Sequence, residues 1–213
     1  MNQDAATETP SDGFRKRLLV AMLASASEKG WTDAAFKSAA TRAGLSEGEA
    51  ILAAPNGVSD LLDALYADAA KAAGGRLADP GIGNLKVRQK VAAGIKAWLA
   101  SLQPHKDAVR RASGSPANVL AGPKGLWAAA DAIWVGLGDA STDANWYTKR
   151  MTLSAVLGST VMAWLGTEDE AEIEAFIDRR IENVMQFEKA KKQARDFAAR
   201  FPNPLDLLGR KAG

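Results

Sequence analysis

The sequence predicts an all-α protein. Apolar residues recur at steps of three and four from Phe14 into the carboxyl-terminal region, which is the period of one helix face. Glycine or proline, followed by Ser, Thr or Asp, separates these apolar stretches, as expected where one helix ends and the next is capped. No stretch alternates between apolar and polar residues as a half-buried strand does. The composition, 47% hydrophobic and 24% charged over 213 residues, is that of a globular chain with its own core.

Composition also excludes several classes of protein. The formal charge of +2 does not by itself indicate a nucleic-acid partner. Cysteine is absent, which excludes disulfides, thiolate metal sites and a cysteine nucleophile, and fits a reducing compartment. No apolar run reaches the length of a membrane span. Residues 1–13 are polar and carry no Lys or Arg, so we expect a disordered tail, neither a secretory signal nor a transit peptide, and a cytoplasmic, bacterial protein.

The amino-terminal region reads as a series of helices with recognisable ends. An apolar stripe that begins at Phe14 stops at Gly30. Thr32 or Asp33 is placed to cap a second, shorter helix that stops at Gly44, because these side chains accept hydrogen bonds from the first free backbone amides.

Two more helices follow in the same region. Ser46 is expected to cap a third helix that carries Ile51 and Leu52, and a Pro-Asn-Gly turn ends it. A longer fourth helix begins at Val58 or Ser59 and runs towards a pair of glycines. Two short helices that meet at a glycine-containing turn, behind a longer one, form a helix-turn-helix pattern.

This spacing resembles the amino-terminal domain of the TetR repressors over residues 14–75. A DNA-reading helix needs base-reading side chains and cations near the phosphates. The third helix instead carries Glu47 and Glu49, and residues 31–60 hold two cations against four carboxylates. We therefore interpret the unit as a degenerate helix-turn-helix scaffold, with DNA not expected as a partner. The alternative is a TetR-type transcriptional repressor that senses a hydrophobic ligand.

A Gly/Pro-rich linker at residues 76–84 is the predicted domain boundary. The apolar periodicity after it predicts a helical ligand-binding and dimerisation bundle over residues 85–188. Its expected helices cover residues 87–102, 105–113, 126–137, 143–165 and 168–185, with a loop at 114–125.

The composition of the bundle allows space for an apolar ligand. Four of the six tryptophans fall on its helix faces, between many Ala and Gly residues that leave gaps beside the large rings. Pockets between helices often bind apolar ligands. The alternative for each large residue is that it simply fills the core. The candidate lipid-binding residues are Ile95, Trp98, Leu99, Leu102, Trp127, Trp134, Met151 and Met162.

The helix that begins near residue 143 opens with aromatic and basic residues side by side. Thr142 or Asp143 is expected to cap it. Tyr147 lies on a stripe with Met151 at helical spacing, so we expect Tyr147 to be partly buried, whereas Trp146 lies off this stripe and is expected to face outward.

The last 25 residues are much more basic than the rest of the chain. Residues 189–213 hold seven cations and two carboxylates. A basic amphipathic segment with apolar residues on one face binds at membrane interfaces. Packing on the bundle, or on a second copy of the chain, explains the same pattern equally well. The candidate membrane-binding residues are Phe197, Phe201, Leu205, Leu207 and Leu208.

Catalytic and metal-binding patterns are not found. His105 is the only histidine, so zinc and haem sites of the common kinds have too few ligands. The glycines at 81 and 83 lack the preceding strand and the lysine of a nucleotide loop. We expect no catalytic residues, no metal and no cofactor, and therefore not an enzyme.

Residues 143–150 read Asp-Ala-Asn-Trp-Tyr-Thr-Lys-Arg, and this string resembles the Coq-nine family of ubiquinone-biosynthesis accessory proteins. The resemblance implies a TetR-like homodimer without DNA binding that binds isoprenoid lipid or phospholipid. It further implies a partner, the di-iron hydroxylase of the pathway, to which quinone intermediates are presented. As a bacterial homologue, the protein is expected at the inner face of the cytoplasmic membrane. The implied partner-binding residues are Asp143, Asn145, Trp146, Tyr147 and Arg150.

Overall fold

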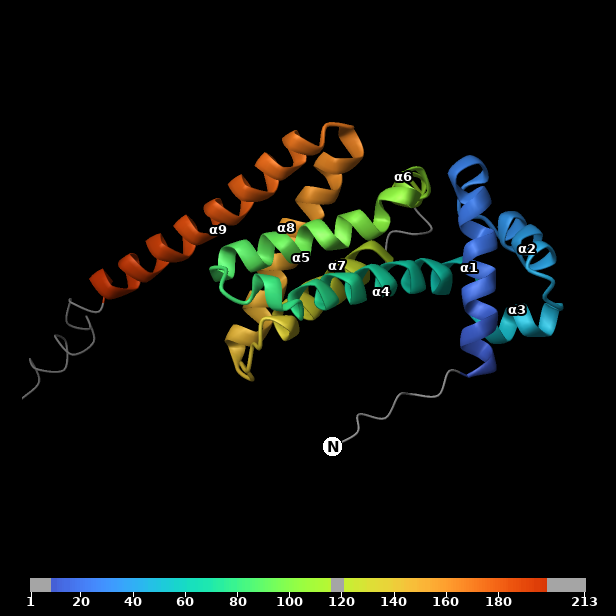
Figure 1. Cartoon of the computed structure of the whole chain (residues 1–213), viewed down its shortest axis with the longest axis horizontal. Coiled ribbons are helices and arrows are strands. Elements are labelled where there is room, and N and C mark those ends of the chain that lie inside the picture. The colour runs from blue at the N-terminus through green and yellow to red at the C-terminus, as the bar shows by residue number, and fades with distance from the viewer. Residues whose placement is uncertain (1–8, 116–120, 199–213) are drawn as a thin grey trace, which may run out of the picture.

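The computed structural model describes residues 9–115 and 121–198, and all regular structure in these two ranges is helical. The expected all-α fold is therefore confirmed. Helices α1, α2 and α3 form one end of the molecule, while α4, α5 and α7 run through its middle (Figure 1). Helix α9 extends the molecule at the opposite end.

The amino-terminal helices begin and end at the expected signals. Thr32 caps α2 and Ser46 caps α3, while Gly30 and Gly44 lie in the left-handed region at the turns, which favours glycine. The first helix begins earlier than predicted, inside the expected tail 1–13, because Thr9 and Asp12 form a capping box. The four helices are α1 (Pro10–Lys29), α2 (Asp33–Arg42), α3 (Glu47–Ala53) and α4 (Val58–Leu77).

Helix α3 presents a different face to the core than expected. Ala50 and Ala53 are buried, whereas Ile51 and Leu52 are exposed. The Arg15 side chain donates a 2.7 Å hydrogen bond to the carbonyl oxygen of Ala53. This bond holds α3 close to α1, where small side chains fit and large ones do not.

The bundle contains the helices that the periodicity predicts, separated by two short 3-10 turns. These elements are η1 (Pro80–Ile82), α5 (Val87–Leu102), η2 (Gln103–His105), α6 (Lys106–Ser113), α7 (Ala121–Gly136), α8 (Ala144–Gly166) and α9 (Glu170–Ala198).

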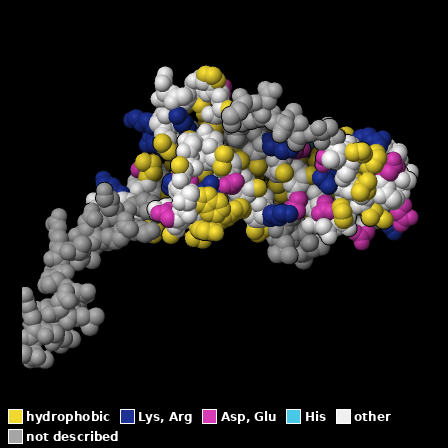
Figure 2. All heavy atoms as spheres, turned by 90° about the horizontal axis from the view of Figure 1, so that it is seen from below, with side chains coloured by type: hydrophobic (Ala, Val, Ile, Leu, Met, Phe, Trp, Pro, Cys, Tyr) yellow, Lys and Arg dark blue, Asp and Glu magenta, His cyan; other side chains and the backbone are white. Residues whose placement is uncertain are grey.

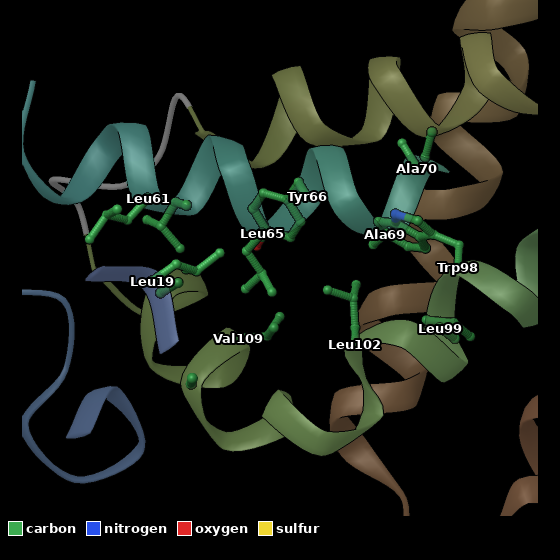
Figure 3. Close-up of a cluster of buried hydrophobic side chains, with 14 of the residues drawn as sticks. Leu19, Leu61, Leu65, Tyr66, Ala69, Ala70, Trp98, Leu99, Leu102 and Val109 are labelled. Atoms are coloured by element: carbon green, nitrogen blue, oxygen red, sulfur yellow. The ribbon is translucent and has the colours of Figure 1, made fainter. Parts of the chain in front are cut away.

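Helix α4 joins the two parts of the chain. It packs mainly against α7 and α5, and only slightly against α1. Figure 3 shows Leu65 and Tyr66 of α4 near Leu102 of α5, Val109 of α6 and Leu19 of α1. Helix α4 comes before the predicted boundary at residues 76–84, but it packs into the core formed by the helices after it. The domain boundary at 76–84 therefore stays a prediction.

Glycines allow α4 and α7 to lie close together, because a side chain at these positions would clash with the other helix. A Cβ atom on Gly136 would lie 2.9 Å from Cβ of Leu77, and one on Gly125 would lie 2.6 Å from Cγ of Tyr66. Gly74 also faces α7, but a Cβ atom there would lie 3.6 Å from the carbonyl oxygen of Ala132, an ordinary contact distance. Helix α4 runs as far as its glycine pair, as expected, and ends at Leu77. The expected loop at 114–125 is wrong at its end, because Gly125 lies in α7. Tertiary packing overrides the low helix propensity of glycine here.

Replacing Gly125 with alanine should lower the free energy of unfolding by about 1–3 kcal/mol, because the added methyl group has no space beside Tyr66. The matched control is Gly122→Ala in the same helix, where nothing lies within 4 Å of the new Cβ. That change should leave stability equal or raise it by up to about 1 kcal/mol. Urea denaturation of both variants makes the comparison, and equal stabilities would contradict the close contact.

Side chains also tie the amino-terminal unit to α6. The Trp31 indole donates a 2.9 Å hydrogen bond to the carbonyl oxygen of Ala108, and Arg111 donates one of 2.8 Å to the carbonyl of Ser27. Both bonds connect residues far apart in the sequence, so they fix the position of the amino-terminal helices against α6.

Candidate ligand cavity and partner surface

A partly open cavity of about 410 Å³ lies in the bundle, lined by parts of α5, α7, α8 and α9. This volume is within the range of small-molecule sites. Its polar lining comes from Arg88 on α5 and from the first turns of α8. Its apolar lining consists of Val87, Val91, Trp134, Leu153, Val156, Ile181, Val184 and Met185.

The candidate lipid-binding residues do not gather at this cavity. Only Trp134 lines it. Ile95, Trp98 and Leu102 are completely buried, and Leu99 is nearly so. Figure 3 shows Trp98, Leu99 and Leu102 of α5 close to buried side chains of α4. Periodicity finds the buried face of α5 correctly, but it does not distinguish a core position from a cavity wall.

Helix α8 is rotated relative to the expected orientation. Its buried residues are Arg150, Leu153, Val156, Leu157, Thr160 and Trp164. Met151 and Met162 face solvent, and so does Tyr147, a residue that is 64% exposed. The expected burial of Tyr147 is thus wrong, and Trp146, expected to face outward, is half-buried. Arg150 explains this rotation. The helix turns the arginine inward because Asp131 and Asp139 accept its hydrogen bonds there.

Three aromatic rings form a cluster between α7 and α8. The ring centroid of Trp127 lies 5.8 Å from that of Trp146 and 6.5 Å from that of Tyr147. Trp146 and Tyr147 meet edge to face at 4.7 Å, a favoured geometry for aromatic pairs. The two neighbouring rings therefore share one cluster, with Tyr147 as its exposed member.

The buried Arg150 side chain packs against the Trp146 ring of this cluster. Its side chain is buried, with 1% of the residue exposed. Its Nε donates to Asp131 at 2.6 Å and its Nη1 to Asp139 at 3.2 Å, while the guanidinium carbon lies 4.1 Å from the ring centroid of Trp146. Arg150 is expected from the sequence to contact a partner; buried as it is, it instead positions Trp146.

Lys149 shares Asp139 with Arg150 and so contacts the turn between α7 and α8. Its ammonium group contacts Asp139 at 2.5 Å and Ser141 at 2.7 Å. It also lies 5.2 Å from the ring centroid of Trp134, on the cavity wall. Hydrogen bonds from Lys149, Ser141 and Arg150 hold the pKa of Asp139 well below its usual value of 3.8.

The pKa of Asp139 predicts an acid-sensitive contribution to stability. Because the folded pKa is below the unfolded value, the stabilisation is complete above about pH 4 and is lost as the pH falls towards the folded pKa. We expect the unfolding free energy of the parent to fall over this acid range more than that of Asp139→Asn. Denaturant titrations between about pH 2 and pH 7 measure the difference. Parallel curves for the two proteins would show that Asp139 is not the group responsible.

The remaining expected partner residues begin α8. Asp143 caps the helix as predicted, accepting a hydrogen bond from the backbone amide of Asn145 at 2.9 Å. Both residues are exposed, and Asn145 also lines the cavity. The candidate membrane residues lie outside what is described here: the side chain of Phe197, and the whole of Phe201, Leu205, Leu207 and Leu208.

Sequence reasoning missed Asp131 and Asp139, which hold Arg150. A carboxylate inside the apolar stretch of α7 is a signal for a buried cation, but the partner lies 19 residues away along the chain. It also missed most of the cavity wall, including Thr152 and Ile181, because their meeting depends on how α5, α8 and α9 pack.

The described residues offer no cluster of metal ligands, since no three His, Asp or Glu side chains gather there. None of the helices in residues 9–115 and 121–198 combines the length and apolar character needed to cross a membrane.

Comparison with known proteins matches residues 119–188 to the COQ9 family. This segment contains the string at 143–150, and the expected resemblance is confirmed. The chain is 32% identical to "Ubiquinone biosynthesis protein COQ9-B, mitochondrial" of Xenopus laevis over 104 residues, which are 46% of this chain and 36% of the frog protein. It is 32% identical to the human COQ9 protein over 82 residues, 38% of this chain and 26% of that one. The matches thus span about a third of these relatives or less.

Among solved structures, the fold resembles a TetR transcriptional regulator from Nitrosomonas europaea ATCC 19718. The TM-score is 0.61 at 17% sequence identity, and the similarity covers 80% of this chain and 97% of that one. The all-α, TetR-like fold is therefore confirmed, and at this identity the likeness concerns the fold alone.

Proposed function

We propose, from the COQ9 match over residues 119–188, that this chain is a non-catalytic accessory protein of ubiquinone biosynthesis. It binds isoprenoid quinone intermediates, or a related lipid, and presents them to a di-iron hydroxylase. The observation that carries the proposal is the apolar cavity. Its lining residues on α7, α8 and α9 all lie within the matched segment 119–188.

The geometry of α8 supports the link between ligand and partner. Asn145, Thr148 and Lys149 face the cavity, while Tyr147, on the same turns, is exposed. A ligand in the cavity and a protein bound at the aromatic cluster would therefore meet on the same two turns. Aromatic residues are also the commonest energetic anchors of protein interfaces.

Lipid uptake tests the proposal. Purified full-length protein should retain lipid through purification or take up a prenylated phenol, giving one ligand per chain by native mass spectrometry. Bovine serum albumin and an unrelated helical protein provide the upper and lower references for uptake. A chain that is free of lipid and takes up no prenylated compound would contradict the proposal.

The remaining parts of the proposal concern location and assembly. Membrane attachment rests on the cations and apolar residues of segment 189–213, while the inner face of the cytoplasmic membrane and the homodimer rest on the family resemblance. Flotation with anionic liposomes and sedimentation equilibrium measure them separately, so either can fail without the other.

A TetR-type repressor is the second candidate, since the fold is that of a TetR regulator. The side chains of α3 do not favour it. Glu47 is exposed at its start, and Arg42 at the end of α2 donates hydrogen bonds to the carbonyl of Ala21 and to Ser25 on α1. Specific DNA binding at low salt that weakens as salt is raised would reverse this ranking.

A further inference from the structure

An open groove of about 570 Å³ lies on the outer face of α1, beside the end of α2. It belongs to the amino-terminal unit, where α1 stands between α4 and the pair α2 and α3 (Figure 1). It shares no lining residue with the cavity of the bundle. Its α1 residues, between Lys16 and Ala24, follow one another at steps of one and three, so they share one helix face.

The floor of the groove is apolar and open to solvent. Val20 is 70% exposed, and Ala24, one turn farther along α1, is exposed as well. Ala21 and Ala43 complete the floor, and their small side chains leave room for a larger apolar side chain from outside. Because exposed apolar surface is unfavourable in water, such a floor favours the apolar side chains of a partner.

The rim of the groove is positively charged. Three of its lining residues are cations and none is a carboxylate. In the described part of the chain, the hydrogen bonds of Arg17 and Arg42 go to uncharged acceptors. Arg17 donates to the carbonyl of Ala43 at 3.5 Å, while Arg42 donates to the carbonyl of Ala21 at 2.7 Å and to Ser25 at 2.8 Å. These bonds orient the two guanidinium groups without neutralising them.

The length of the groove matches a short helix. Residues 16–24 of α1 span about 12 Å at the rise of an α-helix, which seats about two turns of a second helix. Arg17 lies near one end, and Arg42 reaches α1 at Ala21 and Ser25, one to two turns farther along. Carboxylates four or seven residues apart on a helix lie on one face and have a similar separation.

The charge beside the groove does not favour a nucleic acid. Hydrogen bonds from Ser46 lower the pKa of Glu49 on α3, and the charge of Arg17 adds to this effect, so Glu49 lies close to the groove. A DNA duplex carries a phosphate charge about every 1.7 Å along its axis, and a duplex across this face would meet Glu49 as well as the cations. A short helix fits between them.

We propose that this groove on α1 and α2 binds an acidic amphipathic helix of a partner protein. Apolar side chains of the partner pack on Val20 and Ala24, and carboxylates one or two turns apart pair with Arg17 and Arg42. The surface is separate from the aromatic cluster and the cavity, and the proposal does not depend on lipid binding. It gives the chain a second protein-binding surface, at the end of the molecule formed by α1, α2 and α3.

Three synthetic peptides test the charge and shape requirements on the full chain. The first is an acidic helix of about four turns with leucines on one face and glutamates beside them. The second has glutamine in place of every glutamate, and the third is a scrambled acidic peptide without an apolar face. By fluorescence anisotropy at low salt, the parent should bind the first roughly 10-fold more tightly than the second, as expected for two exposed ion pairs. It should also bind the first more tightly than the third, and added salt should remove the advantage over the second.

Reversing a rim charge places the peptide in the groove. Arg17→Glu should weaken binding of the acidic peptide about 10-fold or more and leave the glutamine peptide nearly unchanged. Arg179→Glu on α9 is the matched control, since Arg179 lies 5.9 Å from the ring centroid of Phe176 much as Arg17 lies 5.5 Å from that of Phe14. The control should change neither affinity.

A charge on the floor tests the apolar contact. Val20→Asp should weaken binding of the acidic and the glutamine peptide alike, because both lose their apolar seat. Val135→Asp, at a position on α7 that is 61% exposed, should weaken neither. Thermal melting of all four variants shows whether any loss of binding comes from unfolding.

Each contrary outcome overturns the inference. Equal affinities of the acidic and glutamine peptides would remove the ion pairs, and equal effects of Arg17→Glu and Arg179→Glu would place the peptide elsewhere. Failure of every peptide to bind would remove the groove as a docking site. A DNA duplex that binds more tightly than the acidic peptide, and is lost in Arg17→Glu, would make this a nucleic-acid surface. Lipid uptake is measured separately, so the proposed function stands or fails on its own.

Discussion

Replacing Arg150 with methionine should lower the free energy of unfolding by about 3–5 kcal/mol, the range found when one member of a buried ion pair is removed. The change leaves Asp139, which is 5% exposed at its side chain, without one of its cations, and it removes the charge beneath the Trp146 ring. For a chain of this size the melting temperature should fall by about 10 °C. Urea denaturation and thermal melting measure the two quantities.

Arg76→Met provides the matched control. Arg76 forms an ion pair with Asp79 in which both side chains are more than 40% exposed, so its loss should cost no more than about 1 kcal/mol. If Arg150→Met and the control lost equal stability, Arg150 would not form a stabilising buried ion pair with Asp139, and this pair would not determine which face of α8 is buried.

Tyr147→Ala should lower stability by no more than about 1 kcal/mol, because the exposed ring has little buried area to lose besides its edge-to-face contact with Trp146. Its binding to the di-iron hydroxylase, the partner of the proposed function, should weaken by about 2 kcal/mol or more, roughly 30-fold. Calorimetry or surface plasmon resonance with the hydroxylase gives the affinity, and thermal melting of the same preparation gives the stability.

Two further variants make this comparison decisive. Met162→Ala removes another exposed apolar side chain from α8, far from the aromatic cluster, and should change neither quantity. Trp146→Ala should lower stability, because Trp146 covers Arg150, and any loss of binding then includes a displaced Tyr147. An unchanged affinity for Tyr147→Ala would remove this ring from the partner surface.

The sequence by itself determines where most of the helices begin and end. Thr32, Ser46 and Asp143 cap the helices they were expected to cap, since a cap depends on residues within one turn of each other. Gly30 and Gly44 end helices for the same local reason, a positive φ that glycine tolerates. The all-α class, the TetR-like order of elements and the family resemblance at 143–150 all follow from such short-range patterns.

Only the tertiary structure decided which way each helix faces and where the space lies. Tyr147 and Met151 form as regular a stripe as Arg150, Leu153 and Leu157, and the helix buries the second stripe because Asp131 and Asp139 pair with its arginine. That choice depends on residues brought together from α7 and the following turn, so periodicity within α8 cannot reveal it. The cavity has the same origin: Val91, Val156 and Ile181 meet across three helices, and the gap between them exists only once those helices pack.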